Sequence, residues 1–133
     1  MAEPRVTVVV PTFREAENLA GLVERIERVR AEASFALELL IVDDNSGDGT
    51  RELMDTLRRE PGGEWIRLPE RSKRDGLSSA VLAGFAASDA DVYVVMDADL
   101  SHPAEAIPAL VDRVWNGDAE GPVGMALGSR YVP

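Results

Sequence analysis

The stretch VVMDADLSHP, residues 94–103, runs from apolar residues directly into two carboxylates. The apolar run indicates a buried β-strand, and Asp97 and Asp99 follow it at positions i and i+2. On an extended segment these two side chains project to the same side. Two such carboxylates repel each other unless a cation joins them, and oxygen ligands without His or Cys suit Mg²⁺ or Mn²⁺. The pattern therefore indicates a divalent metal site, although Asp-x-Asp triplets are also common by chance in surface loops.

Apolar runs of the same kind recur along the chain and alternate with helical patterns. The expected strands are residues 6–10, 36–42, 64–68, 91–96 and 123–132. Helices are expected near residues 17–32, 50–60 and 77–87 and from Pro103 onward. Pro103 is expected at the first position of its helix, and the strand at 64–68 near a sheet edge. Repeated β–α units predict a three-layer α/β architecture with a mostly parallel sheet.

Composition limits the class of protein. The chain has 133 residues, the length of one domain, and a formal net charge of −10. A nucleic-acid-binding protein would carry a basic face, so this charge argues against a nucleic-acid partner. An anionic substrate would need local cations, either basic side chains or a metal ion. The absence of cysteine excludes a disulfide framework and fits a reducing compartment, and no apolar stretch is long enough to span a bilayer.

Polar residues follow the carboxyl ends of the expected strands, where sheets of this kind bind ligands. Asp43 and Asp44 follow the second strand. Two interpretations stay open for them: they cap a nearby helix, or they accept hydrogen bonds from a nucleobase. His102, the only histidine, is expected to be hydrogen-bonded to backbone at a helix start rather than to act as a catalytic base.

Basic residues lie in two further segments. The loop RSKRDG, residues 71–76, places Lys73 and Arg74 before a helix, which suits either a solvated loop or a phosphate site. Arg130 follows two small residues near the end of the chain. Its guanidinium group could hold a phosphate bidentately or form a surface salt bridge.

Five motifs occur in an order that is far more specific than any one of them. They are VVVPTFREAENL, IVDDNSGDGT, GLSSAVLAGF, VVMDADLSHP and GSRY. In this order the chain resembles the family 2 glycosyltransferases of the GT-A fold, and within them the polyprenyl-phosphate (dolichyl-phosphate) mannose synthases. The resemblance covers Val6 to Tyr131, essentially the whole chain. It implies a GT-A (nucleotide-diphospho-sugar transferase) fold.

The resemblance assigns one group of residues to the nucleotide. Pro11, Phe13 and Glu15 match the segment that flanks it. Val42 and Asp44 match positions at the base and ribose, and Arg74 is a further candidate for the donor phosphates. Phe13 stands where Tyr is usual, so this side chain can stack but offers no hydroxyl.

A second group of residues is assigned to the diphosphate and the metal. Asp97, Ala98 and Asp99 match the DxD motif that binds both, and Ser101 stands near the metal in the same turn. Arg130 matches an arginine of the donor site. Asp97, Asp99 and Arg130 are therefore the expected catalytic residues, with Mg²⁺ or Mn²⁺ as the cofactor.

The implied reaction moves mannose from GDP-mannose to a polyprenyl phosphate with inversion at the anomeric carbon. Two alternatives stay open: a family 2 transferase with another sugar nucleotide or acceptor, or a fragment that binds nucleotide without turnover. Residues 1–133 are expected to form the nucleotide-sugar-binding domain, as the N-terminal part of a longer catalytic domain, because these synthases continue well past GSRY. The resemblance also implies a cytoplasmic protein, peripheral at the cytoplasmic face of the membrane that holds the acceptor.

Overall fold

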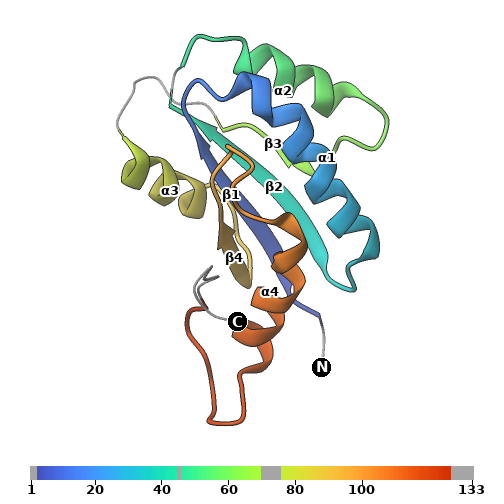
Figure 1. Ribbon diagram of the computed structural model, residues 1–133, viewed down its shortest axis with the longest axis vertical. Coiled ribbons are helices and arrows are strands. Elements are labelled where there is room, and N and C mark those ends of the chain that lie inside the picture. The colour runs from blue at the N-terminus through green and yellow to red at the C-terminus, as the bar shows by residue number, and fades with distance from the viewer. Residues whose placement is uncertain (1–2, 45, 70–75, 127–133) are drawn as a thin grey trace.

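The computed structural model describes residues 3–44, 46–69 and 76–126 (Figure 1). Strands and helices alternate along the chain, as the sequence predicts. In order they are β1 (Arg5–Thr12), α1 (Ala16–Glu32), β2 (Ala36–Asp43), α2 (Thr50–Arg59), β3 (Ile66–Arg67), α3 (Leu77–Ala86), β4 (Val92–Val95), the 3₁₀ turn η1 (Ala104–Ala106) and α4 (Ile107–Asn116). None of the helices in these ranges has the length and apolar character needed to cross a membrane.

The four strands form one parallel sheet in the order β3–β2–β1–β4. β1 pairs with β2 along its whole length, which places Pro11 beside Val42. β1 pairs with β4 over a shorter stretch that ends with Val9 beside Val95. β3 pairs only with β2 and therefore lies at an edge of the sheet, as predicted.

Two apolar clusters cover the two faces of the sheet, because successive strand residues point to opposite faces. Val8 and Val10 of β1 belong to a large cluster with residues of α1, α2 and α4. Val9, between them, belongs to a small cluster with Ala80 of α3. Figure 1 shows α3 on one side of the strands and α1 and α2 on the other. Helices therefore cover both faces, which confirms the predicted three-layer α/β architecture.

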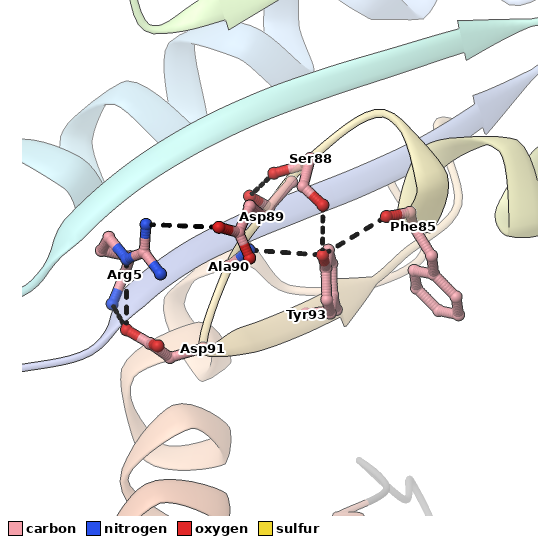
Figure 2. Close-up of polar contacts among 8 residues, drawn as sticks. Arg5, Phe85, Ser88, Asp89, Ala90, Asp91 and Tyr93 are labelled. Atoms are coloured by element: carbon pink, nitrogen blue, oxygen red, sulfur yellow. Dashed lines mark hydrogen bonds and ion pairs between the residues drawn. The ribbon is translucent and has the colours of Figure 1, made fainter.

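A polar network closes the amino edge of the sheet between β1 and β4 (Figure 2). Arg5 donates to Oδ2 of Asp91 from its backbone N–H at 2.8 Å and from Nε at 3.5 Å. The hydroxyl of Tyr93 donates to the carbonyl of Ser88 at 2.6 Å, and its ring centroid lies 4.9 Å from that of Phe85. These contacts fix the start of β4 beside the start of β1.

The order in which strands are added to the sheet changes direction after β3. It runs from β1 to β2 and β3 on one side, and then crosses to the other side of β1 to form β4. In open α/β sheets, ligands bind beyond the carboxyl ends of the strands where such a reversal occurs. The topology therefore points to the ends of β1 and β4 as the place of a ligand site.

Two expectations from the sequence need comment. Pro103 is not the first residue of a helix, because it precedes η1 and α4 begins only at Ile107. Pro108 lies in the first turn of α4 instead, where a missing backbone N–H breaks no helical bond. Residues 123–126 of the expected fifth strand are not in a strand, and the rest of that segment, 127–132, lies outside the described residues.

Candidate functional site

Asp97, Ala98 and Asp99 follow β4 at the carboxyl edge of the sheet. Ala98 is only 2% exposed and belongs to the large apolar cluster, whereas both aspartates are exposed. Burial of the central residue places the two carboxylates on the same, solvent-facing side, as the i, i+2 spacing predicts.

The turn after Asp99 is held by a left-handed residue and by Ser101. Leu100 has a φ of 67°, and its side chain packs against the large apolar cluster. Ser101 donates to Oδ1 of Asp99 from its backbone N–H at 3.0 Å and from its hydroxyl at 2.5 Å. The Ser101 hydroxyl, helped by the N–H, holds the pKa of Asp99 below its ordinary value. The carboxylate is therefore charged at neutral pH, as a metal ligand must be.

His102 closes the same turn onto Asp97. The backbone N–H of Asp97 donates to Nδ1 of His102 at 3.1 Å. Nε2 of the ring lies 3.8 Å from Oδ2 of Asp97. The hydrogen bond to backbone agrees with the expected role of this histidine. Because Nδ1 acts as an acceptor here, the neutral ring carries its proton on Nε2, the nitrogen nearer the carboxylate.

The donor atoms of this turn fit a hard divalent cation. Asp97 and Asp99 supply carboxylate oxygens, and Ser101 adds a hydroxyl oxygen next to one of them. Within the described ranges, no group of three or more His, Cys, Asp and Glu side chains is arranged to hold a metal ion. Mg²⁺ typically takes one or two carboxylates and completes its shell with waters and substrate phosphates. The donor set therefore suits a metal shared with a diphosphate, not one enclosed by protein.

Asp43, at the end of β2, is bound within its own loop and to β1. Its Oδ1 accepts from the hydroxyl of Thr12 at 2.9 Å, and its Oδ2 accepts from the backbone N–H of Ser46 at 3.1 Å. The hydroxyl oxygen of Ser46 lies 2.6 Å from Oδ1 of Asp43 and 3.0 Å from Oδ1 of Asp48. That hydroxyl has one proton to donate, and the shorter distance assigns the proton to Asp43.

Asp44 joins the end of β2 to the start of α3. Its side chain is only 6% exposed, and its Oδ2 accepts from the backbone N–H of Gly76 at 3.0 Å. Its own N–H donates to the carbonyl of Thr12 at 2.8 Å. This contact is of the kind that the capping interpretation predicts. The helix concerned is α3, however, and the bonded Gly76 lies 32 residues further along the chain.

Pro11, Val42 and Phe13 lie where β1 and β2 end. Pro11 is buried in register with Val42, which has no exposed surface, so both form part of the sheet at its carboxyl edge. Phe13 is half-buried, and the guanidinium of Arg14 lies over its ring, with Cζ 5.2 Å from the ring centre. An aromatic face with a cation above it thus follows the carboxyl end of β1.

Glu15 is the residue before α1. Its Oε2 accepts from Nδ2 of Asn18 at 2.9 Å, and its carbonyl accepts from the backbone N–H of Asn18 at the same distance. Arg14, just before it, has a φ of 57°. Two of the described non-glycine residues have a positive φ, Arg14 and Leu100, and both lie at this edge of the sheet. Such conformations cluster at functional sites.

Three basic side chains are predicted to bind phosphate. Arg130, Arg74 and Lys73 all lie outside the described residues. Asp48, by contrast, makes contacts that sequence reasoning missed, because one of them joins residues 32 apart in the chain. Its carboxylate accepts hydrogen bonds from the first residues of both α1 and α2.

A groove in the described part of the chain lies away from this site. It has a volume of about 510 Å³ and is lined mainly by residues of α1 and α4, such as Arg28 and Trp115, and by Phe35, which precedes β2. None of the aspartates at the carboxyl edge of the sheet lines it. Asp97 and Asp99 are exposed and Asp43 and Asp44 are buried, and we place the site from the chemistry of these residues and from the topology.

Comparison with known proteins identifies a family and several proteins that are similar to this chain. The sequence profile of Glycosyl transferase family 2 matches residues 7–132. A dolichol-phosphate mannosyltransferase of Pyrococcus furiosus is 43% identical over 128 residues, which are 96% of this chain and 34% of that protein. An undecaprenyl-phosphate 4-deoxy-4-formamido-L-arabinose transferase of Pseudomonas aeruginosa is 36% identical over 112 residues, 84% of this chain and 33% of that protein. The chain thus spans about a third of the length of these relatives.

A solved structure supports the same relationship. A mannosyltransferase from Pyrobaculum calidifontis, in complex with GDP-mannose and Mn²⁺, superposes with a TM-score of 0.70 at 28% sequence identity. The match covers 90% of this chain and 34% of that one. This likeness confirms the predicted GT-A fold.

Proposed function

The chain belongs to glycosyl transferase family 2, and from this premise we propose that it is the donor-binding part of an inverting mannosyltransferase. The donor is GDP-mannose and the acceptor is a polyprenyl phosphate. The observation that carries the proposal is the exposed pair Asp97 and Asp99, which lies where β4 ends beside β1, at the reversal point of the sheet. The mannosyltransferases among the relatives support mannose as the sugar.

Asp97 and Asp99 would hold Mg²⁺ or Mn²⁺ against the donor's diphosphate, with Ser101 keeping Asp99 ionised and oriented. The bound metal would neutralise the charge that develops on the departing nucleoside diphosphate. The structure of a relative that contains both GDP-mannose and Mn²⁺ supports a divalent cation, and the choice between Mg²⁺ and Mn²⁺ belongs to the proposal. Local positive charge is needed here because the chain carries a net charge of −10.

The nucleotide would lie between the ends of β1 and β2. Phe13, after β1, offers an aromatic face, and the buried carboxylate of Asp44, after β2, offers an acceptor. Glu15, Pro11 and Val42 shape the surrounding edge. Arg130 and the basic residues Arg74 and Lys73 would bind the donor phosphates from segments outside the described residues.

The acceptor's own phosphate oxygen would be the nucleophile. A phosphate monoester has a second pKa of about 6, so it is largely ionised at neutral pH and needs no general base. This agrees with the single histidine of the chain, whose Nδ1 already accepts a backbone hydrogen bond. A polyprenyl acceptor would place the protein at a membrane surface. We propose that this surface is the cytoplasmic face of the membrane.

A second donor has specific support. The relative from Pseudomonas aeruginosa is named for transfer of 4-deoxy-4-formamido-L-arabinose to undecaprenyl phosphate, so a similar sequence serves another sugar with the same kind of acceptor. Calorimetric titration with GDP, GDP-mannose and UDP, each with Mn²⁺ and with EDTA, separates the two. Preference for guanine nucleotides supports mannose, whereas preference for UDP overturns it.

Turnover needs its own experiment. Labelled GDP-mannose, Mg²⁺ and a short polyprenyl phosphate are incubated with the chain, and lipid-linked mannose is measured. Formation of that product supports the transferase. Nucleotide binding without any product favours a fragment that binds the donor and depends on the rest of a longer protein for catalysis.

A further inference from the structure

Asp48, in the loop between β2 and α2, accepts hydrogen bonds at the amino ends of two helices. Its Oδ2 accepts from the backbone N–H of Ala16, the first residue of α1, at 3.2 Å. Its Oδ1 accepts from the backbone N–H of Thr50, the first residue of α2, at 3.2 Å and from the Thr50 hydroxyl at 2.6 Å. The N-cap residues Glu15 and Gly49 make no side-chain cap of their own. One carboxylate therefore caps both helices.

A second connection between the same two segments lies at Thr12, the last residue of β1. Its carbonyl accepts from the backbone N–H of Asp44 at 2.8 Å, and its hydroxyl donates to Asp43 at 2.9 Å. Residues 13–15 lie between Thr12 and Ala16. The short segment that carries Phe13 and Glu15 is thus fixed at both ends to the loop after β2, and Asp48 makes the second of the two attachments.

The segment between these attachments is strained. Arg14, at its centre, has a φ of 57°, which is unfavourable for a side chain with a Cβ. A residue in such a conformation persists only where surrounding contacts hold it. The two attachments supply that restraint on either side of Arg14.

The charge of Asp48 suits this double contact. Partial burial raises the pKa of Asp48, but the hydrogen bonds from Thr50 and Ala16 outweigh this effect and bring the pKa below its ordinary value. A negative charge at the amino end of a helix is favourable, and here it serves two helices. An asparagine at this position would have a single acceptor oxygen, and its amide group would face one of the two N–H donors.

We propose that Asp48 is a positioning residue for the nucleotide, because by joining the ends of α1 and α2 it fixes Phe13 and Glu15 against the loop that carries Asp44. This inference rests on the proposed function, since it assumes that a nucleotide binds between those segments. The inference goes beyond the proposed function because it assigns Asp48 a role in binding that is exerted through residues 13–15.

The test compares nucleotide affinity with stability in matched variants. Calorimetry with GDP-mannose and Mn²⁺ is carried out well below the melting temperature, so that only folded protein is compared. We expect Asp48→Ala to raise the Kd about tenfold, because the competent arrangement of residues 13–15 would be populated only part of the time. Asp48→Asn, which keeps one acceptor, should lie between Asp48→Ala and the wild type, and it remains informative if the alanine variant does not fold.

Two controls separate positioning from simple helix capping. Thr50→Val removes only the hydroxyl on the α2 side and leaves the bond to Ala16, so its Kd should stay within about twofold of the wild type even if its Tm falls. Asp55→Asn removes a carboxylate from α2 that pairs with Arg58 and touches neither helix end. It should change neither quantity.

The outcomes are distinct. A lower Tm with an unchanged Kd for the Asp48 variants would leave Asp48 as a cap and overturn the inference, while the proposed function stands. A rise in Kd for Thr50→Val equal to that for Asp48→Ala would also overturn it, because the contact to α1 would then not matter. A wild-type chain that binds neither GDP-mannose nor GDP would overturn the proposed function, and the inference would fall with it.

Discussion

The backbone N–H of Asp97 donates a hydrogen bond to Nδ1 of His102 across the turn that follows β4, with the two nitrogens 3.1 Å apart. An imidazole nitrogen accepts a hydrogen bond only when it carries no proton. The neutral ring of His102 should therefore be the Nε2–H tautomer. Long-range ¹H–¹⁵N spectra of the labelled protein above pH 8 would show this directly, because the two tautomers differ in their nitrogen shifts. A spectrum of the Nδ1–H tautomer would contradict the geometry of the turn.

Asp99→Asn should abolish the metal-dependent part of nucleotide binding and leave the fold intact. The variant removes a charged oxygen ligand from an exposed position, where no packing is lost. The Kd of GDP in the presence of Mn²⁺ should then equal its Kd in EDTA. Asp112→Asn, on the surface of α4, is the control and should keep the full effect of Mn²⁺. Metal-dependent binding that survives in Asp99→Asn would remove Asp99 from the site.

Asp44→Ala should weaken nucleotide binding even without metal, and it should also destabilise the protein. The N–H of Gly76 would lose its acceptor, and a hydrogen bond of this kind contributes about 1 kcal/mol. Asp44→Asn keeps an acceptor for Gly76 and should retain most of the stability. If its Kd for GDP in EDTA nevertheless rises, the carboxylate contributes to binding itself. If both variants bind GDP like the wild type, Asp44 serves only to hold α3.

Much of the fold follows from local patterns that tertiary contacts do not override. The apolar runs at 6–10 and 36–42 become β1 and β2 because both strands are buried on both faces. β1 extends beyond its predicted end and includes Pro11. The carbonyl of Val9 accepts a hydrogen bond from the backbone N–H of Met96, so the polar backbone groups of Val9 point toward β4. Backbone groups two residues apart in a strand point to the same side, so the nitrogen of Pro11 also points toward β4, and β4 has already ended at that level. The missing N–H of proline therefore breaks no bond of the sheet.

The site was less predictable, because its contacts join residues far apart in the chain. The spacing of Asp97 and Asp99 is local, and the sequence predicts their common orientation. The bond from Gly76 to Asp44 and the bond from Ala16 to Asp48 each span 32 residues, and nothing in either segment alone indicates them. Pro103 was difficult to place for a different reason, because its signal is local but ambiguous. Proline suits the first position of a helix and also the residue that precedes a helix, so its place in the turn depends on packing.

Two glycines in helices should respond in opposite ways to alanine. A Cβ at Gly84 of α3 would lie 2.5 Å from Cγ1 of Val9, which is fully buried in the sheet. Overpacking of this kind costs about 1–3 kcal/mol, which outweighs a gain in helix propensity of up to about 1 kcal/mol. At Gly21 of α1 the nearest atom, Cδ1 of Leu100, would be 3.9 Å away.

Gly84→Ala should therefore lower the free energy of unfolding, and Gly21→Ala should raise it by up to about 1 kcal/mol. Urea denaturation followed by circular dichroism measures both variants against the wild type. Gly21→Ala is the matched control, since it makes the same chemical change in a helix with room for the methyl group. Equal effects of the two substitutions would show that α3 does not pack on Val9 as closely as described.

The contacts of Asp48 also predict how stability depends on pH. Its hydrogen bonds lower its pKa in the folded protein relative to the unfolded chain, where an aspartate has a pKa of about 4. The stabilisation from Asp48 is therefore fully present above about pH 4 and is lost as the pH falls through the lower, folded value. As the pH falls below about 4, the free energy of unfolding of the wild type should fall more steeply than that of Asp48→Asn. Asp91 and Asp99 also have lowered pKa values and act in the same direction, but both proteins contain them, so the difference between the two curves isolates Asp48. Urea denaturation at intervals from pH 2 to pH 7 measures both curves, and parallel curves would mean that the carboxylate of Asp48 makes no stronger contacts in the folded protein than in the unfolded chain.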